Sequence, residues 1–140
     1  LVSGQGILNI YEFLRKFRNL EEPKWLEEEL NTKASAKTIS AAALEQKDAV
    51  CVETLQLFLK YLAVECAQLA LKAKATGGIY IGGGIAPKIL QLIDEKEFYK
   101  NFINVGRMEH LLKTIPVKIV LNDKTALMGA AYFAAMGIKN

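Results

Sequence analysis

The sequence predicts a helix-rich α/β protein with few strands. Two short apolar runs, at residues 78–81 and 116–121, are bounded by glycine, proline or polar residues, as buried strands are. Around them, apolar residues recur at helical spacing, most clearly over a long stretch that ends at about Ala75. Of the 140 residues, 51% are hydrophobic and 24% are charged, which is the balance of a globular core.

Helices dominate the first half of the sequence. Apolar residues between positions 7 and 17 form an i, i+3, i+4, i+7 stripe, which predicts an amphipathic helix. We expect Ser3 to cap this helix, which runs to about Arg18. The other helices of this half are expected within residues 19–32, over 35–44, and from a joint at 46–48 to about Ala75.

A strand, a glycine turn and a helix follow the long helix. The strand at 78–81 leads into three consecutive glycines, and Pro87 occupies the first turn of a helix over 87–93, where its missing N–H costs nothing. The remaining elements are expected to be short helices over 97–104 and 108–114, a strand over 116–121 and a closing helix over 125–136.

The closing helix is expected to pack tightly against a sheet, because Gly129 shares a face with Leu127 and Ala131. Two parallel strands cannot by themselves bury both faces of so much apolar helix. We therefore expect further strands from a longer parent chain or from another copy of this one. Because Leu1 already enters a structured pattern, residues 1–140 are expected to form a single partial domain.

The glycine turn is the first candidate binding feature. A strand that ends in consecutive glycines and opens a helix lets backbone approach a ligand, and N–H groups at the helix start favour anions. Gly82, Gly83 and Gly84 supply that geometry. Neither a Walker-type Gly-Lys-Ser/Thr nor a G-x-G-x-x-G pattern accompanies them. On spacing alone, a tight turn without a ligand is an equally good interpretation.

Composition argues against several other functions. The net charge is +3 with the signs intermixed, which is not a nucleic-acid footprint, and no apolar run approaches membrane-spanning length. Cys51 and Cys66 fit buried thiols of a cytoplasmic protein. His110 lacks partners at metal-ligand spacing, and we expect no metal site. The pair Asn122 and Asp123 is best explained as ending a strand and capping a helix.

Several motifs in order resemble the bacterial-type glucokinases. Residues 77–87, Gly-Gly-Ile-Tyr-Ile-Gly-Gly-Gly-Ile-Ala-Pro, resemble the family's adenosine motif. The other similar segments are residues 1–11, 98–107, 115–117 and 122–131, so the resemblance covers essentially the whole chain. The family belongs to the hexokinase and actin-like superfamily. The resemblance therefore implies the C-terminal portion of an actin-like, ribonuclease H-like ATPase domain, within the larger lobe.

The resemblance also implies a partial ATP site. The residues expected to bind the nucleotide are Gly82, Gly83, Gly84 and Ile85 at the adenosine, Pro87 in the bordering helix, and Ser3 and Gly4 on a facing helix. The family's phosphate loops, catalytic base and sugar-binding segments have no counterpart here. The resemblance thus implies no catalytic residue in this chain, an inactive segment, and Mg²⁺ and glucose held by the missing part of the parent.

Two alternatives remain open. The chain could be a non-catalytic module of the same fold that forms a homo-oligomer through its sheet edge and apolar helices. It could also come from a related sugar kinase, because the sugar contacts of the family lie outside this segment.

Overall fold

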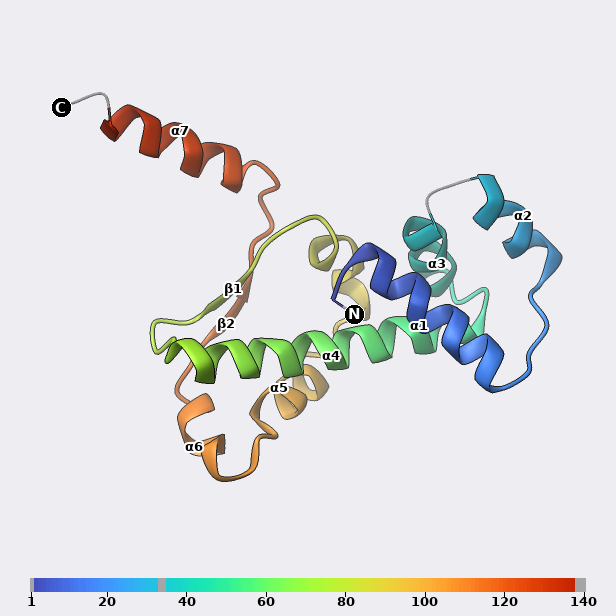
Figure 1. Ribbon diagram of the computed structural model, residues 1–140, viewed down its shortest axis with the longest axis horizontal. Coiled ribbons are helices and arrows are strands. Elements are labelled where there is room, and N and C mark those ends of the chain that lie inside the picture. Colours follow the sequence, from blue (N-terminus) through green and yellow to red (C-terminus); the bar gives the residue numbers. More distant parts are fainter. Residues whose placement is uncertain (1, 33–34, 138–140) are drawn as a thin grey trace.

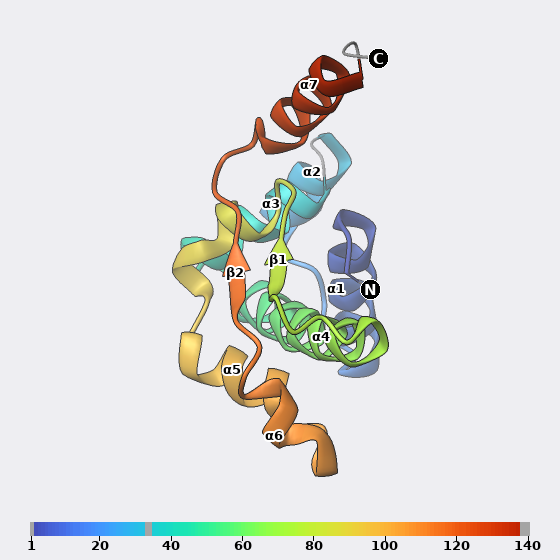
Figure 2. The same cartoon turned by 90° about the vertical axis from the view of Figure 1, so that its left-hand side faces the viewer.

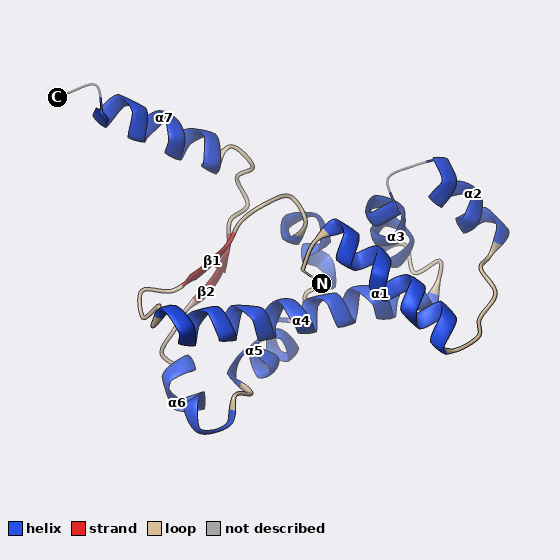
Figure 3. Cartoon of the chain, in the orientation of Figure 1, coloured by secondary structure: helices blue, strands red, loops and turns tan. Residues whose placement is uncertain are grey.

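The structure is a computed structural model that describes residues 2–32 and 35–137 of the chain. Helices make up most of the described chain, which also contains one small two-stranded sheet (Figures 1 and 3). The described elements are α1 (Gly4–Phe17), α2 (Lys24–Thr32), α3 (Ser35–Leu44), α4 (Ala49–Ala73), β1 (Ile79–Ile81), the 3₁₀ helix η1 (Ala86–Leu92), α5 (Glu95–Ile103), the 3₁₀ turn η2 (Gly106–Met108), α6 (Glu109–Leu112), β2 (Val117–Ile119) and α7 (Thr125–Gly137). The predicted helix-rich α/β class with few strands is confirmed.

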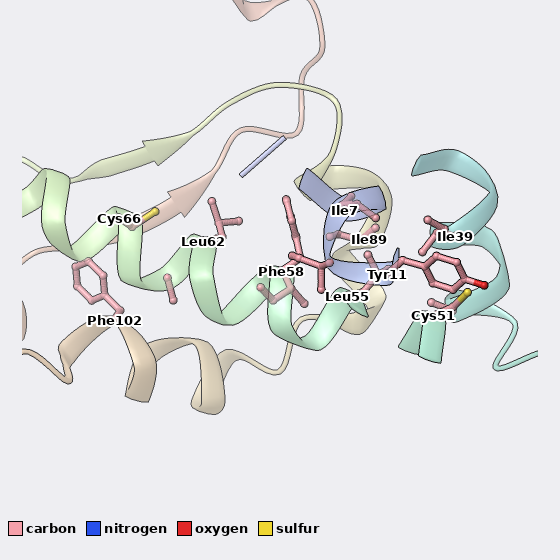
Figure 4. Close-up of a cluster of buried hydrophobic side chains, with 14 of the residues drawn as sticks. Ile7, Tyr11, Ile39, Cys51, Leu55, Phe58, Leu62, Cys66, Ile89 and Phe102 are labelled. Atoms are coloured by element: carbon pink, nitrogen blue, oxygen red, sulfur yellow. The ribbon is translucent and has the colours of Figure 1, made fainter. Parts of the chain in front are cut away.

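Helix α4 is the centre of the core. Its N-cap is Asp48, whose carboxylate accepts a hydrogen bond from the Cys51 amide, and its C-cap is Lys74, which has a left-handed conformation. Helices α1 and α3 pack on its first half, and α5 and α6 pack nearer its end. Figure 4 shows Leu55, Phe58 and Leu62 between these two groups of helices. One helix therefore joins the two halves of the hydrophobic core.

The capping prediction at Ser3 is confirmed. Its Oγ accepts a hydrogen bond from the Gly6 amide at 3.0 Å, which satisfies one of the free N–H groups of the first turn of α1. Most of the predicted apolar stripe of α1 packs against α3 and α4, but its last member, Phe17, is 76% exposed. Its buried members after the first turn are Ile7, Ile10, Tyr11 and Leu14.

The two strands pair in parallel, as predicted, with Ile79 opposite Val117 and Ile81 opposite Ile119. Both strands are shorter than expected, at three residues each. Ile79 is buried in the core, whereas Tyr80 is exposed on the opposite face with the Lys118 ammonium 5.8 Å from its ring centroid. The sheet thus has one covered face and one open face within the described residues.

The prediction that the closing helix packs tightly against a sheet is wrong. Helix α7 projects away from the rest of the chain in both views (Figures 1 and 2), and all its side chains are exposed. Apart from its chain neighbours and the backbone of its own helix, no atom of the described residues lies within 4 Å of where a Cβ on Gly129 would be. The physical reason is that two three-residue strands offer too little surface to receive a 13-residue helix.

The segment after Pro87 differs from the predicted α-helix. Residues 86–92 form a 3₁₀ helix that is interrupted at Ile89, whose φ and ψ are −106° and 16°. The N-cap position is Ile85, which has no side chain that can cap, and a segment this short nucleates an α-helix poorly. Similarly, the predicted helix 108–114 is shorter, over 109–112, and the one predicted from residue 97 begins at Glu95 because Asp94 caps it.

A buried ion pair connects α1 to the start of α4. The Arg15 guanidinium lies 2.5 Å from the Asp48 carboxylate, and the two side chains are only 12% and 9% exposed. Burial opposes ionisation of Asp48, but hydrogen bonds from the Cys51 amide and from Arg15 outweigh it and hold the pKa of Asp48 below its ordinary value. Arg15 also donates to the Tyr11 hydroxyl, which donates to Glu22. The same carboxylate therefore serves as helix cap and as interhelical contact.

Replacing Asp48 by alanine should lower the free energy of unfolding by about 3 kcal/mol, because both the helix cap and the partner of the Arg15 charge are lost.

The variant Asp48→Asn keeps a side chain that can cap the helix but removes the negative charge. The pKa of Asp48 is lower in the folded chain than its ordinary value of about 3.9. Its contribution to stability is therefore fully present at a pH above that ordinary value, and it is lost as the pH falls through the folded pKa. Denaturant titrations from pH 2 to 7 should show a weaker pH dependence for Asp48→Asn than for the unmodified chain.

The matched control is the exposed pair of Arg18 and Glu53, in which Glu53→Gln should cost less than about 1 kcal/mol. Identical acid profiles for Asp48→Asn and the unmodified chain would show that this ion pair does not stabilise the fold.

Candidate functional site

The predicted order of strand, glycine turn and helix is confirmed. Strand β1 ends at Ile81, whose carbonyl accepts a hydrogen bond from the Val120 amide at 2.9 Å. The chain then leaves the sheet through Gly82, Gly83 and Gly84, and enters η1. Figure 2 shows this loop extending beyond the end of β1 before it turns back. The turn is exposed at the carboxyl end of a parallel strand, where ligands bind in open α/β sheets.

Of the three glycines in the turn, the middle one alone has a backbone conformation that requires glycine. Gly83 has φ +96°, which L side chains rarely adopt. Gly82 and Gly84 do not have positive φ. A Cβ at Gly82 would meet nothing within 4 Å among the described residues, and one at Gly84 would meet only the Lys88 ammonium at 3.8 Å. The space beside Gly82 and Gly84 is therefore open.

The residues after the turn anchor it to the core. Ala86 is 3% exposed, and Ile85 packs on the core cluster from a half-buried position. The Ile85 carbonyl accepts hydrogen bonds from the amides of Lys88 and Ile89, at 3.0 and 3.3 Å. Pro87 lies in the first turn of η1, as predicted. The glycines are thus exposed between a strand and a helical turn that are both fixed by packing.

Sequence reasoning missed Lys88. Its ammonium lies beside Gly84 because it sits four residues later, on the first turn of η1. The expectation of an anion site made of helix N–H groups has less support, because η1 is a short 3₁₀ helix with weaker alignment of its amides. The turn therefore offers open space and one nearby positive charge.

Ser3 and Gly4 lie at the start of α1, next to residues of α1 and α3. The Ser3 hydroxyl is used as a cap, and a Cβ at Gly4 would be 3.6 Å from the Cβ of Ala36. The structure does not show them in contact with the glycine turn. Ile7 of α1 and Ile89 of η1 both belong to the buried hydrophobic core (Figure 4). The nucleotide role of Ser3 and Gly4 stays a prediction.

Other chemically capable side chains have structural partners. His110 is exposed on α6, with Nδ1 3.0 Å from the Arg107 carbonyl oxygen. Burial raises the pKa of Cys51 to about 12 and that of Cys66 to about 11, so both thiols stay protonated at neutral pH. Asn122 accepts a hydrogen bond from the Lys124 amide, as expected of a residue at a helix start. Within the described ranges, no three His, Cys, Asp or Glu residues gather as a metal site.

No helix in the described part of the chain combines the length and the apolar character needed to span a membrane. The longest helix, α4, carries charged residues along its exposed positions.

Comparison with known proteins identifies the fold. The glucokinase family model matches residues 1–136. A glucokinase of Synechocystis sp. is 42% identical over 96% of this chain and 41% of the relative, and one of Nostoc punctiforme is 45% identical over 96% and 43%. The crystal structure of a glucokinase from an Antarctic psychrotroph superposes with a TM-score of 0.77 at 31% identity, over 92% of this chain and 37% of that one.

The helix-rich α/β arrangement of this chain therefore also occurs in the crystal structure of a kinase. The chain belongs to the glucokinase family, as its motifs predicted. It spans about two fifths of the length of the curated relatives that it matches.

Alanine substitution should change the stability of the chain by different amounts at Gly82 and at Gly83. Gly83→Ala should lower the free energy of unfolding by about 1–2 kcal/mol, because the residue must keep a positive φ. Gly82→Ala should leave stability within about 0.5 kcal/mol, since, apart from its chain neighbours, the added methyl group meets no atom of the described residues within 4 Å. Thermal unfolding of both variants checks this. Equal losses at positions 82 and 83 would contradict the assigned geometry.

Proposed function

We propose that this chain is the C-terminal, adenosine-binding segment of an ATP-dependent glucokinase that phosphorylates glucose. In this proposal the segment is a single partial domain, the C-terminal portion of the larger lobe of an actin-like, ribonuclease H-like ATPase in the cytoplasm. The nucleotide contacts are made by Gly82–Gly84 and Ile85, with Pro87 holding the adjacent turn and Ser3 and Gly4 approaching from α1. Family membership and the exposed turn support it.

The observation that carries the proposal is the open space at Gly82 and Gly84. Neither residue has a positive φ, and neither is required to be glycine by packing among the described residues. The adenine or ribose of a nucleotide could approach the exposed backbone there, in the turn that the half-buried Ile81 and Ile85 flank in sequence. A side chain at either position would occupy that space.

The phosphates and the chemistry are assigned to the remainder of the enzyme. Phosphoryl transfer requires a positioned hydroxyl, a base beside it, and metal and backbone donors at the phosphates. Mg²⁺ in such enzymes is bound by one or two carboxylates together with the substrate phosphates. The proposal therefore gives this chain nucleotide positioning, and gives Mg²⁺, glucose and the catalytic base to the part of the family's length outside the match.

A second candidate function is a non-catalytic module that self-associates. The observation in its favour is the exposed apolar surface of α7, where Phe133 is 80% exposed. A related sugar kinase is the third, since sugar specificity depends on contacts outside this segment. Light scattering on the purified chain addresses the second, and a panel of hexoses with the assembled enzyme addresses the third.

The purified 140-residue chain should not phosphorylate glucose. We expect a coupled glucose 6-phosphate assay to give no turnover above a protein-free blank, because the catalytic groups are assigned elsewhere. A chimera in which this chain replaces the matched segment of the Synechocystis glucokinase is the positive control. Turnover by the isolated chain that scales with its concentration would overturn this part of the proposal.

In the same chimera, Gly82→Ala should raise the KM for ATP about tenfold, equivalent to about 1.4 kcal/mol, without changing the KM for glucose. The added methyl group would enter the space assigned to the adenosine. Gly77→Ala is the matched control, because Gly77 too lacks a positive φ and, apart from its chain neighbours, has no atom of the described residues within 4 Å of its Cβ position. An unchanged KM for ATP in Gly82→Ala would refute the assigned adenosine site.

A further inference from the structure

We propose that Lys88 is a phosphate-binding residue, whose ammonium pairs with the phosphate group nearest the ribose of the bound nucleotide. This inference rests on the proposed adenosine site at Gly82–Gly84 and extends it, since the other phosphate contacts are assigned to the rest of the enzyme. Lys88 would thereby make this segment bind a nucleotide more tightly than a nucleoside.

The Lys88 ammonium lies at the edge of the open space in the glycine turn. Its Nζ is 3.8 Å from where a Cβ on Gly84 would be, and, apart from the chain neighbours of Gly84, no other atom of the described residues lies within 4 Å of that position. The backbone of Lys88 is held in place, because its amide donates to the Ile85 carbonyl at 3.0 Å and the next residue, Ile89, is buried. A ligand atom that enters the space beside Gly84 therefore comes within contact distance of the ammonium.

The positive charge of Lys88 is not neutralised by the part of the chain that the structure describes. The side chain is exposed, and the ion pairs among the described residues are formed by other lysines and arginines. Residues 75–93, which contain the whole turn, include no other charged residue. A single unopposed positive charge therefore lies beside the exposed glycines.

The chemistry of an ammonium determines which part of a nucleotide it contacts. It offers three N–H donors and no acceptor, so it pairs best with an anionic oxygen. Adenine and ribose are uncharged, whereas the phosphates are anionic. The amides of Gly82, Gly83 and Gly84 donate no hydrogen bond to any described residue, so the same loop has further donors free. For a residue beside the adenosine, the phosphate attached to the ribose is the one within reach.

Inhibition of the Synechocystis chimera by adenosine and by AMP, each in competition with ATP, tests this assignment, because the two ligands differ by one phosphate. Lys88→Gln should raise the inhibition constant of AMP about tenfold and leave that of adenosine unchanged. Lys88→Arg keeps the positive charge and should bind AMP within about threefold of the unmodified chimera. The matched control is Lys60→Gln, which removes an exposed lysine of α4 and should change neither constant.

The adenosine site itself is tested in the same assay by Gly82→Ala, which should weaken adenosine and AMP alike. Unchanged inhibition by both ligands in Gly82→Ala would refute the adenosine site and, with it, the contact of Lys88. A loss in Gly82→Ala combined with unchanged AMP inhibition in Lys88→Gln would overturn the role of Lys88 alone.

Two further results would also overturn the phosphate contact. Equal weakening of adenosine and AMP in Lys88→Gln would assign the ammonium to the base or the ribose. A loss of AMP affinity in Lys88→Arg as large as that in Lys88→Gln would show that the positive charge is not what binds.

Discussion

The burial of α4 is the constraint on which the rest of this structure depends. One 25-residue helix contacts α1 and α3 over its first half and α5 and α6 nearer its end, and its fully buried side chains include Leu55, Ala63 and Ala70. Burial on this scale is the main favourable contribution to folding. The helix starts where Asp48 both caps it and pairs with Arg15. Its position is thereby fixed relative to α1.

The position of the glycine turn follows from the end of α4. Lys74 ends the helix with φ 49°, and Gly78 redirects the chain into β1 with φ +121°. A Cβ at Gly78 would lie 3.1 Å from the Pro116 carbonyl oxygen, so this glycine lets the two strands meet. The turn at Gly82–Gly84 is then held between the sheet and the buried Ile89 of η1. The sheet and η1 therefore hold the turn in place while its backbone stays exposed.

Local signals in the sequence predicted what depends on local chemistry. The Ser3 cap, the stripe of α1, the long central helix and two parallel strands follow from spacing and capping residues, and the structure has them. The predictions that failed concern contacts between separate elements of the fold. The small residues of α7 indicate close packing, but the surface to pack on is absent from the described residues, so α7 stands exposed. Lys88 was missed because its approach to Gly84 requires the geometry of η1.

The most direct test of the adenosine site is photolabelling of the Synechocystis chimera with 8-azido-ATP, followed by tryptic mapping. Cleavage after Lys74 and Lys88 releases residues 75–88 as one peptide that contains the whole turn. The account predicts label in this peptide, lost when unmodified ATP competes. Competable label confined to other peptides, with residues 75–88 unmodified, would contradict the assignment of Gly82–Gly84 to the nucleotide.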